Sequence, residues 1–451
     1  MDQNWLPRTV CRPLLAVRGA SPAVSRFRTL WLAYRSRWSP AGCINAAALA
    51  LATIYGLVIL QGVVRDGLYA WAGSDFRAYR AAAEVAHDYG YAKVYDLQLL
   101  GAFESHLVGF SEPGQFRTNF VTVDVPYLPA YLVLFQPLLL VDWTTGFAIW
   151  SALSLAAITA YLLVLKRSTG IHSSRSIGLA VVLSFPSLYS LRWGQVNPFL
   201  LIALGEFLRL GMRGADYRSG LWLGALLVKP QTLILFAPAL VIAHRWRMLL
   251  GLLTMAVAVI LVSLAVGGVE ALASEAQLIL SYSADGITAQ PSIMPNWRGM
   301  AVRLATQIPP TIAWSVAITG MLLTAMCALS LWHRARRPHS RAFATMTLGT
   351  LAATCSVTWY SLIDTGLLLS APLFYLAGRG RLPVRIAAAW ILAPYLALFA
   401  AAIDLSLNPI APFLANLLLV TWSALTFHRS AVPESTAMAH EVEWSTDVPL
   451  G

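Results

Sequence analysis

The sequence predicts an all-α protein that crosses a membrane many times, and three observations carry this prediction. Of the 451 residues, 58% are hydrophobic and only 12% are charged, whereas soluble domains are about 45–50% apolar and about 25% charged. The mean hydropathy is +0.64, and so little charge cannot cover the surface of a water-soluble fold. Apolar runs recur from Ala46 to Phe427, which excludes a single membrane anchor. The composition likewise excludes a cytosolic enzyme, a secreted disulfide scaffold and a disordered protein.

The net charge of +11 is interpreted as a topology signal rather than as a nucleic-acid-binding surface. Cytoplasmic segments of membrane proteins carry an excess of lysine and arginine. The first 42 residues hold seven arginines against one acidic residue, Asp2, and no apolar run precedes them. We therefore expect residues 1–42 to form a cytoplasmic N-terminal arm and not a cleavable signal peptide. The four cysteines lie far apart and show no metal-binding spacing.

The first span is expected at about residues 44–64, which is long enough to cross a hydrocarbon core of ~30 Å. The chain then emerges outside and forms a polar external segment over residues 66–126. Within that segment, residues 76–85 favour a helix that lies along the membrane surface, with Ser74 or Asp75 as its N-cap.

Two apolar runs are predicted to be broken helices. The run 127–141 is short and contains two prolines, so we interpret it as a broken or re-entrant helix. The run 220–243 begins and ends at arginines that should be cytoplasmic, and Lys229-Pro230 lies at its centre. This arrangement favours a hairpin of two half-helices that turns at Lys229. An ordinary span, with one arginine cluster assigned to the wrong side, is the alternative.

The remaining crossings follow from the requirement that the other arginine clusters be cytoplasmic. Together with the first span they give about ten full crossings, and the nine others are 146–165, 177–191, 197–210, 248–268, 310–332, 342–358, 362–377, 384–404 and 408–427. A transmembrane domain then covers residues 43–428, with a second external loop at 269–309. Residues 429–451 form a polar cytoplasmic tail, so both termini are expected in the cytoplasm.

Polar side chains that are unusual beside apolar spans gather on the predicted external side. An ionisable residue in hydrocarbon costs several kcal/mol unless it is solvated or paired, so such residues are functional candidates. Asp364 is the expected counter-ion of Lys229. We expect one external cavity to be lined by Asp75, Arg192, Gln195, Asn197, Lys229, Arg298 and Asp364.

Most of these residues also have a purely structural interpretation. Asp75 could merely cap a helix, and Gln195 and Asn197 could satisfy the backbone of a turn. Arg192 and Arg298 could extend their guanidinium groups to lipid headgroups. The convergence of the set, and not any single member, is the observation that points to a site.

Carboxylates, cations and aromatic rings in one external cavity fit the transfer of a sugar from a lipid-linked phosphate. Carboxylates activate hydroxyl groups, and cations hold phosphates. The sequence contains no dinucleotide glycine fingerprint, no P-loop and no His/Cys metal spacing, so no nucleotide donor or cofactor is expected and no metal ligands are assigned. Metal dependence stays open, because Asp75 with Asp96 or Asp124 could hold a divalent ion, although no spacing requires one. A flippase or transporter of lipid-linked sugars is the alternative, because it would use the same Lys229–Asp364 pair without forming a bond.

A set of short motifs occurs in a fixed order over roughly residues 44–425, and each is weak alone. They are Ser74-Asp75-Phe76 with Tyr79 and Ala81-Ala82, Val94-Tyr95-Asp96, Pro126-Tyr127-Leu128-Pro129, Gly194-Gln195-Val196-Asn197, Lys229-Pro230-Gln231, Arg245-Trp246-Arg247, Asn296-Trp297-Arg298-Gly299 and Asp364. This ordered set resembles glycosyltransferase family 87. The resemblance implies a GT-C-like membrane bundle whose external loops carry the active site.

The resemblance also implies a substrate class and a set of roles. The donor would be a polyprenyl phosphate carrying mannose or arabinofuranose, and the acceptor a cell-envelope glycolipid or glycan at the bacterial plasma membrane. Asp75 would be the general base. The residues expected to bind donor phosphate or sugar are Arg298, Lys229, Gln195, Asn197, Trp297 and Tyr127, with Asp364, Tyr79 and Arg192 supporting them.

The sequence departs from the family pattern at the predicted external end of the span 342–358. Some relatives carry histidines there, whereas this chain reads Val357-Thr358-Trp359-Tyr360-Ser361. Any role of such a histidine is either absent here or filled by Tyr360 or Asp364.

Overall fold

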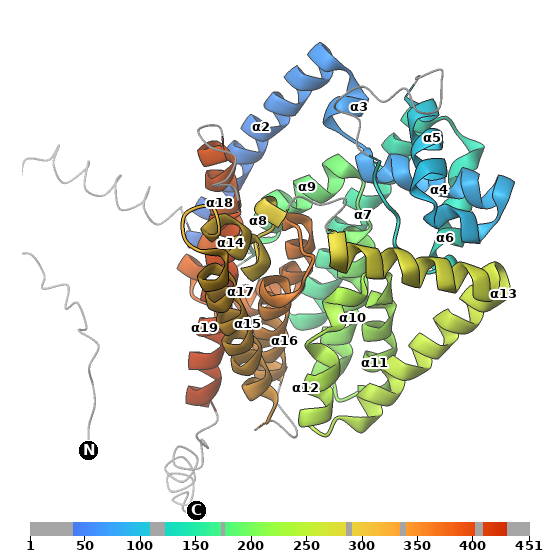
Figure 1. Ribbon diagram of the computed structural model, residues 1–451. Coiled ribbons are helices and arrows are strands. Elements are labelled where there is room, and N and C mark those ends of the chain that lie inside the picture. The colour runs from blue at the N-terminus through green and yellow to red at the C-terminus, as the bar shows by residue number, and fades with distance from the viewer. Residues whose placement is uncertain are drawn as a thin grey trace, which may run out of the picture.

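The computed structural model describes residues 39–108, 122–172, 176–285, 291–333, 340–401 and 409–430. These residues form α-helices and short 3₁₀ helices and contain no strand, which confirms the all-α prediction (Figure 1). Nearly all of the predicted N-terminal arm and C-terminal tail lies outside the described residues.

Among the described helices, five are long and apolar enough to cross a membrane. They are α2 (Pro40–Asp66), α7 (Trp143–Thr169), α13 (Trp246–Asp285), α15 (Pro310–His333) and α19 (Ile410–Ser430). The shorter apolar helices include α16 (Ser340–Val357), α17 (Ser370–Gly378) and α18 (Val384–Ala401). A membrane protein is therefore supported, and the total of about ten crossings stays a prediction.

The segment after α2 folds into a group of short helices. They are α3 (Leu68–Trp71), α4 (Ser74–Tyr89), η1 (Tyr91–Tyr95) and α5 (Leu97–Leu107), and Figure 1 shows α4 and α5 together at the end of the molecule that α2 runs towards. The helix expected at residues 76–85 is α4, and its position along a membrane surface stays a prediction, but the predicted N-cap is wrong. Gly73 is the N-cap with φ 75°, and Ser74 and Asp75 lie in the first turn.

The proline-containing run 127–141 is broken, as predicted. It consists of α6 (Pro129–Leu132) followed by η2 (Val133–Leu140), because Pro137 cannot sustain an α-helical hydrogen-bond ladder. After α7, three helices lead to the centre of the molecule. They are α8 (Gly178–Val182), α9 (Phe185–Trp193) and α10 (Asn197–Met212).

The run around Lys229 is a hairpin. Its pieces are α11 (Asp216–Gly224), η4 (Ala225–Val228), η5 (Pro230–Leu233) and α12 (Phe236–Ile242). Lys229 breaks the helix with φ −126° and ψ 78°. Arg245 Nη2 lies 2.5 Å from Asp216 Oδ1, so the two ends of the run meet on one side. A straight span would separate these ends by the thickness of a bilayer.

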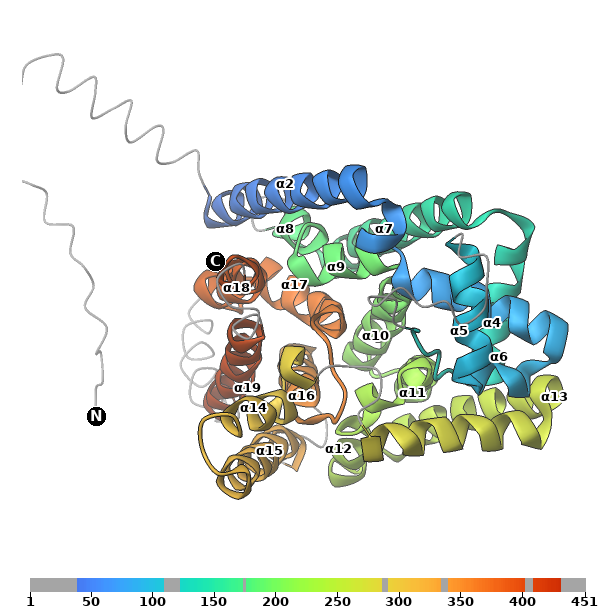
Figure 2. The ribbon, with the colours of Figure 1, turned by 45° about the horizontal axis from the view of Figure 1, so that its top comes forward.

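Helix α13 bends at Gly268, and its two arms meet at an angle (Figure 1). Figure 2 shows α13 along the edge of the molecule opposite α2. The chain continues through η6 (Pro291–Ile293) and α14 (Trp297–Leu304) to α15. Helices α15, α16 and α19 pack against one another, and η7 (Ile363–Leu369) joins α16 to α17.

Helices α11 and α13 approach closely because glycines face each other. A Cβ atom at Gly220 would lie 1.9 Å from the backbone oxygen of Met248, and one at Gly251 would lie 2.1 Å from the backbone oxygen of Tyr217. Small residues at such contacts are typical of helix pairs in membranes, where packing drives association. This pairing fixes the first half of the Lys229 hairpin.

We expect Gly220→Ala to destabilise the protein, because the clashing partner is backbone that cannot move aside. Overpacking typically costs about 1–3 kcal/mol, so the midpoint of thermal unfolding should fall by several degrees. Gly56→Ala on α2 is the matched control, since no atom lies within 4 Å of its Cβ position. Equal midpoints for the two variants would contradict the close packing of α11 on α13.

Candidate functional site

Asp75 is positioned by a close contact between the start of α4 and the turn that joins α9 to α10. Gly73 N donates to Arg192 O at 2.8 Å, and Trp150 Nε1 donates to Gly194 O at 2.9 Å. Gly194 has φ 76°, and a Cβ atom there would lie 2.5 Å from Phe76 Cβ. Only glycine satisfies both conditions, and the contact places the Asp75 side chain beside that of Gln195.

Gln195 connects Asp75 to Lys229. Its Nε2 donates to Asp75 Oδ1 at 2.5 Å, and its Oε1 accepts from Lys229 Nζ at 2.8 Å. An ammonium can only donate, so Lys229 fixes the amide with its oxygen towards the lysine and its nitrogen towards the carboxylate. Gln195 is thereby held at both ends.

Lys229 and Asp364 form a buried ion pair. Lys229 Nζ lies 3.1 Å from Asp364 Oδ2, and their exposed fractions are 7% and 1%. Asn197 Nδ2 donates to the same Asp364 oxygen at 2.6 Å. The hydrogen-bonded chain Asp75–Gln195–Lys229–Asp364–Asn197, which we call the polar chain, therefore joins residues from α4, the α9–α10 turn, the hairpin break and η7.

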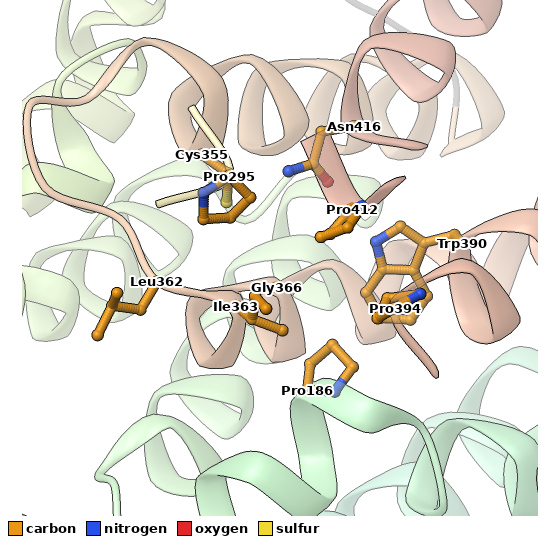
Figure 3. A pocket seen from close by; sticks show the side chains of 10 residues that line it. All are labelled: Pro186, Pro295, Cys355, Leu362, Ile363, Gly366, Trp390, Pro394, Pro412 and Asn416. Carbon is orange, nitrogen blue, oxygen red and sulfur yellow. The ribbon is translucent and has the colours of Figure 1, made fainter. Parts of the chain in front are cut away.

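The 3₁₀ helix η7 borders a small cavity of about 10 Å³. The cavity is lined by Ile363 and Gly366 of η7 and by side chains of other elements, among them Pro186 and Trp390 (Figure 3). This volume is about that of one water molecule, so the cavity is too small to hold a sugar or a phosphate.

Two tyrosines lie beside the polar chain. The hydroxyl oxygens of Tyr79 and Tyr127 are 3.0 Å apart, and the Tyr79 ring stacks on Phe135 with centroids separated by 4.6 Å. Burial raises the pKa of Tyr127 to about 12, so its phenol stays neutral. Tyr95 Oη donates to Tyr127 O at 2.8 Å and holds this segment in place.

The electrostatics of the site favour a protonatable Asp75. Burial, together with the negative charge of Asp364, raises the pKa of Asp75 to about 7, although Lys229 opposes the rise. Ser74 Oγ donates to Asp75 Oδ2 at 3.2 Å. Asp75 is half-buried, whereas Asp364 is fully buried, so of the two acids Asp75 is the one that a substrate can reach.

Arg192 supports the loop that precedes Asp75. Its Nε donates to Trp71 O at 2.6 Å and its Nη1 to Tyr55 Oη at 3.2 Å, while its guanidinium lies 4.2 Å from the centroid of Trp193. The arginine thus ties α9 to α2 and α3 and does not join the polar chain.

Arg298 and Trp297 are not brought to the polar chain. Arg298 Nη1 donates to Trp359 O at 3.2 Å, and the guanidinium lies 4.3 Å from the centroid of the exposed Trp359 ring. Trp297 Nε1 donates to Thr324 Oγ1 at 3.0 Å, and its ring packs on Phe413. Arg298 therefore contacts the segment that leads to Asp364, whereas Trp297 packs against α15 and α19.

Arg77 and Glu104 form a second buried ion pair, which the sequence analysis did not predict. Arg77 Nη2 lies 3.1 Å from Glu104 Oε2, and Val123 N donates to Glu104 Oε1 at 3.0 Å. The pair holds the segment before Tyr127 against α4, two residues after Asp75. Its partners are 27 residues apart and share no motif, so only the fold brings them together.

In chemical terms, the polar chain offers one carboxylate, Asp75, that a substrate can reach and that can accept a proton. The Gln195 amide holds this carboxylate in place, and Gln195 in turn accepts a hydrogen bond from the Lys229 ammonium. Within the described part of the chain, no group of three histidine, cysteine, aspartate or glutamate side chains is placed to hold a metal ion.

Comparison with known proteins gives one match. The model of glycosyltransferase family 87 matches residues 126–358, which is just over half of the chain and includes Gln195, Asn197 and Lys229. Asp75 and Asp364 lie outside the matched segment and contact it through the polar chain. No curated protein matches, and neither does any solved structure.

Proposed function

The chain belongs to glycosyltransferase family 87, and we propose that it transfers a mannose- or arabinofuranose-type sugar from a polyprenyl-phosphate donor. The acceptor is a glycolipid or glycan of the bacterial cell envelope, and the site faces the outside of the plasma membrane. The arginine clusters support this orientation, with both termini cytoplasmic. The observation that carries the proposal is a reachable aspartate held by Gln195 above a buried Lys229–Asp364 pair.

Asp75 acts as the general base. Its carboxylate takes the proton of the acceptor hydroxyl while that oxygen attacks the anomeric carbon and the bond from the sugar to the phosphate breaks. The electron pair of the broken bond leaves with the polyprenyl phosphate. A base works best when its pKa lies near the operating pH, and the pKa of Asp75, raised to about 7 by burial, meets this condition.

Lys229 stabilises the leaving phosphate, and the contact of Arg298 with that phosphate stays a prediction because Arg298 contacts Trp359 and not the polar chain. Lys229 has three N–H donors, of which Gln195 and Asp364 accept two, so the third supports a contact with a phosphate oxygen. Arg298 lies on the Trp359 ring, and Trp359 and Tyr360 are exposed aromatic surface beside it. Cations placed where charge develops lower the barrier to transfer.

Contacts in the structure support the proposed roles of Asn197 and Tyr127, but not that of Trp297. Asn197 holds Asp364, and Tyr127 borders the site through its neutral phenol. The sugar contact of Trp297 stays a prediction, because its ring packs between α15 and α19.

We expect Asp75→Asn to reduce sugar transfer by about 10²–10⁴-fold, because the amide keeps the shape of the side chain but cannot accept the proton. The measurement is transfer of labelled sugar from a synthetic polyprenyl-phosphate donor to membrane acceptors by the reconstituted protein. Asp88→Asn is the matched control, since Asp88 is an exposed acid on the same helix. Near-normal transfer by Asp75→Asn would rule out the proposed base.

The pH profile of the wild-type protein tests the same assignment independently. Asp75 must be deprotonated to accept a proton, so kcat/KM should rise about tenfold per pH unit below about pH 7 and level off above it. The ordinary aspartate value is about 3.9, and a profile that is already flat from pH 5 upwards would contradict a raised pKa at the base.

A further inference from the structure

A second cavity, of about 380 Å³, lies away from the polar chain. The start of α2 and the turn from α17 to α18 enclose it, and its walls are apolar or glycine throughout, including Pro40, Ala41, Ile177, Ala377, Leu382 and Ala387. Its volume falls in the range of about 300–1,000 Å³ that is typical of ligand pockets. The cavity shares no lining residue with the polar chain.

Three arginines alternate with the wall residues along the turn. Arg379, Arg381 and Arg385 are exposed, and none forms an ion pair with any acid in the described ranges. Arg385 also lies in the first turn of α18, where the helix dipole is positive and a cation is unfavourable. The turn is therefore a concentration of uncompensated positive charge.

Two of the other predicted cytoplasmic arginines are compensated by acids. Arg209 is paired with Glu206 at 2.5 Å, and Arg245 is paired with Asp216 at the same distance. The α17–α18 turn thus combines an apolar cavity with unpaired cations. No wall residue offers a polar side chain that could recognise a sugar.

We propose that this cavity binds one acyl chain of an anionic phospholipid, whose phosphate contacts Arg379, Arg381 and Arg385. Basic pockets between membrane helices on the cytoplasmic side are suited to anionic lipid headgroups, and each nearby arginine contributes favourably. The lipid fills the space between α2 and α18 and neutralises the turn. It joins the two helices at the predicted cytoplasmic face, on the opposite side from the substrates.

The test is the retention of lipid by the purified full-length protein, counted by native mass spectrometry. Phosphatidylglycerol and phosphatidylcholine with the same acyl chains are the two probes. The wild-type protein should retain one phosphatidylglycerol in preference to phosphatidylcholine. In the triple variant Arg379→Gln/Arg381→Gln/Arg385→Gln, binding should be at least about 10-fold weaker.

Two further variants make the result specific. Ala387→Phe fills the cavity, leaves the arginines in place and should also lose the lipid. Arg213→Gln/Arg218→Gln/Arg247→Gln removes three exposed arginines that lie outside the α17–α18 turn and should keep the lipid. Equal retention of the two lipids, equal loss in the control triple variant, or full competition by glycerol 3-phosphate, which lacks acyl chains, would overturn the proposal.

Discussion

The buried ion pair between Lys229 and Asp364 is the interaction on which the rest of the site depends. A lysine in apolar surroundings is tolerated only when a carboxylate and further hydrogen bonds replace its water. Asp364 and Gln195 supply these partners from two other elements, and Asn197 in turn donates to Asp364. Because Lys229 can only donate, it also fixes the direction of the Gln195 amide, and that direction decides which atom meets Asp75. A single buried charge therefore sets the geometry at the reachable carboxylate.

The fold supplies this arrangement by interrupting helices. The hairpin break presents Lys229, the α9–α10 turn presents Gln195, and the 3₁₀ segment η7 presents Asp364. Non-helical backbone at membrane depth is tolerated only where it is buried in protein or lines a cavity, and here its side chains meet one another. The close glycine contacts between α11 and α13, and the Arg77–Glu104 pair behind α4, hold the outer parts of the site against this centre.

Composition was sufficient to predict the helical membrane class, and prolines and arginines were sufficient to predict the broken runs. The convergence of Asp75, Gln195, Lys229 and Asp364 could also be predicted, because Lys229 is costly within an apolar run and the other three lie on the same predicted external side. The Arg77–Glu104 pair could not, since both residues look like ordinary surface charges. The prediction of the α4 N-cap was wrong because either a glycine in the left-handed conformation or a polar residue can take that position. The hydrogen bond from Gly73 N to Arg192 O selects the glycine. The contacts of Arg298 and Trp297 could not be predicted either. The two residues are adjacent in one motif, but Arg298 contacts Trp359 and Trp297 packs against α15 and α19.

The most direct test of the central claim is a double-mutant cycle on Lys229 and Asp364, read as the midpoint of thermal unfolding in one defined bilayer. Each single change, Lys229→Met or Asp364→Leu, leaves a buried charge without its partner and should cost about 3–5 kcal/mol. The double variant removes both charges and should recover most of that stability while remaining inactive. Losses that simply add in the double variant would contradict the account, because two residues that do not interact behave in that way.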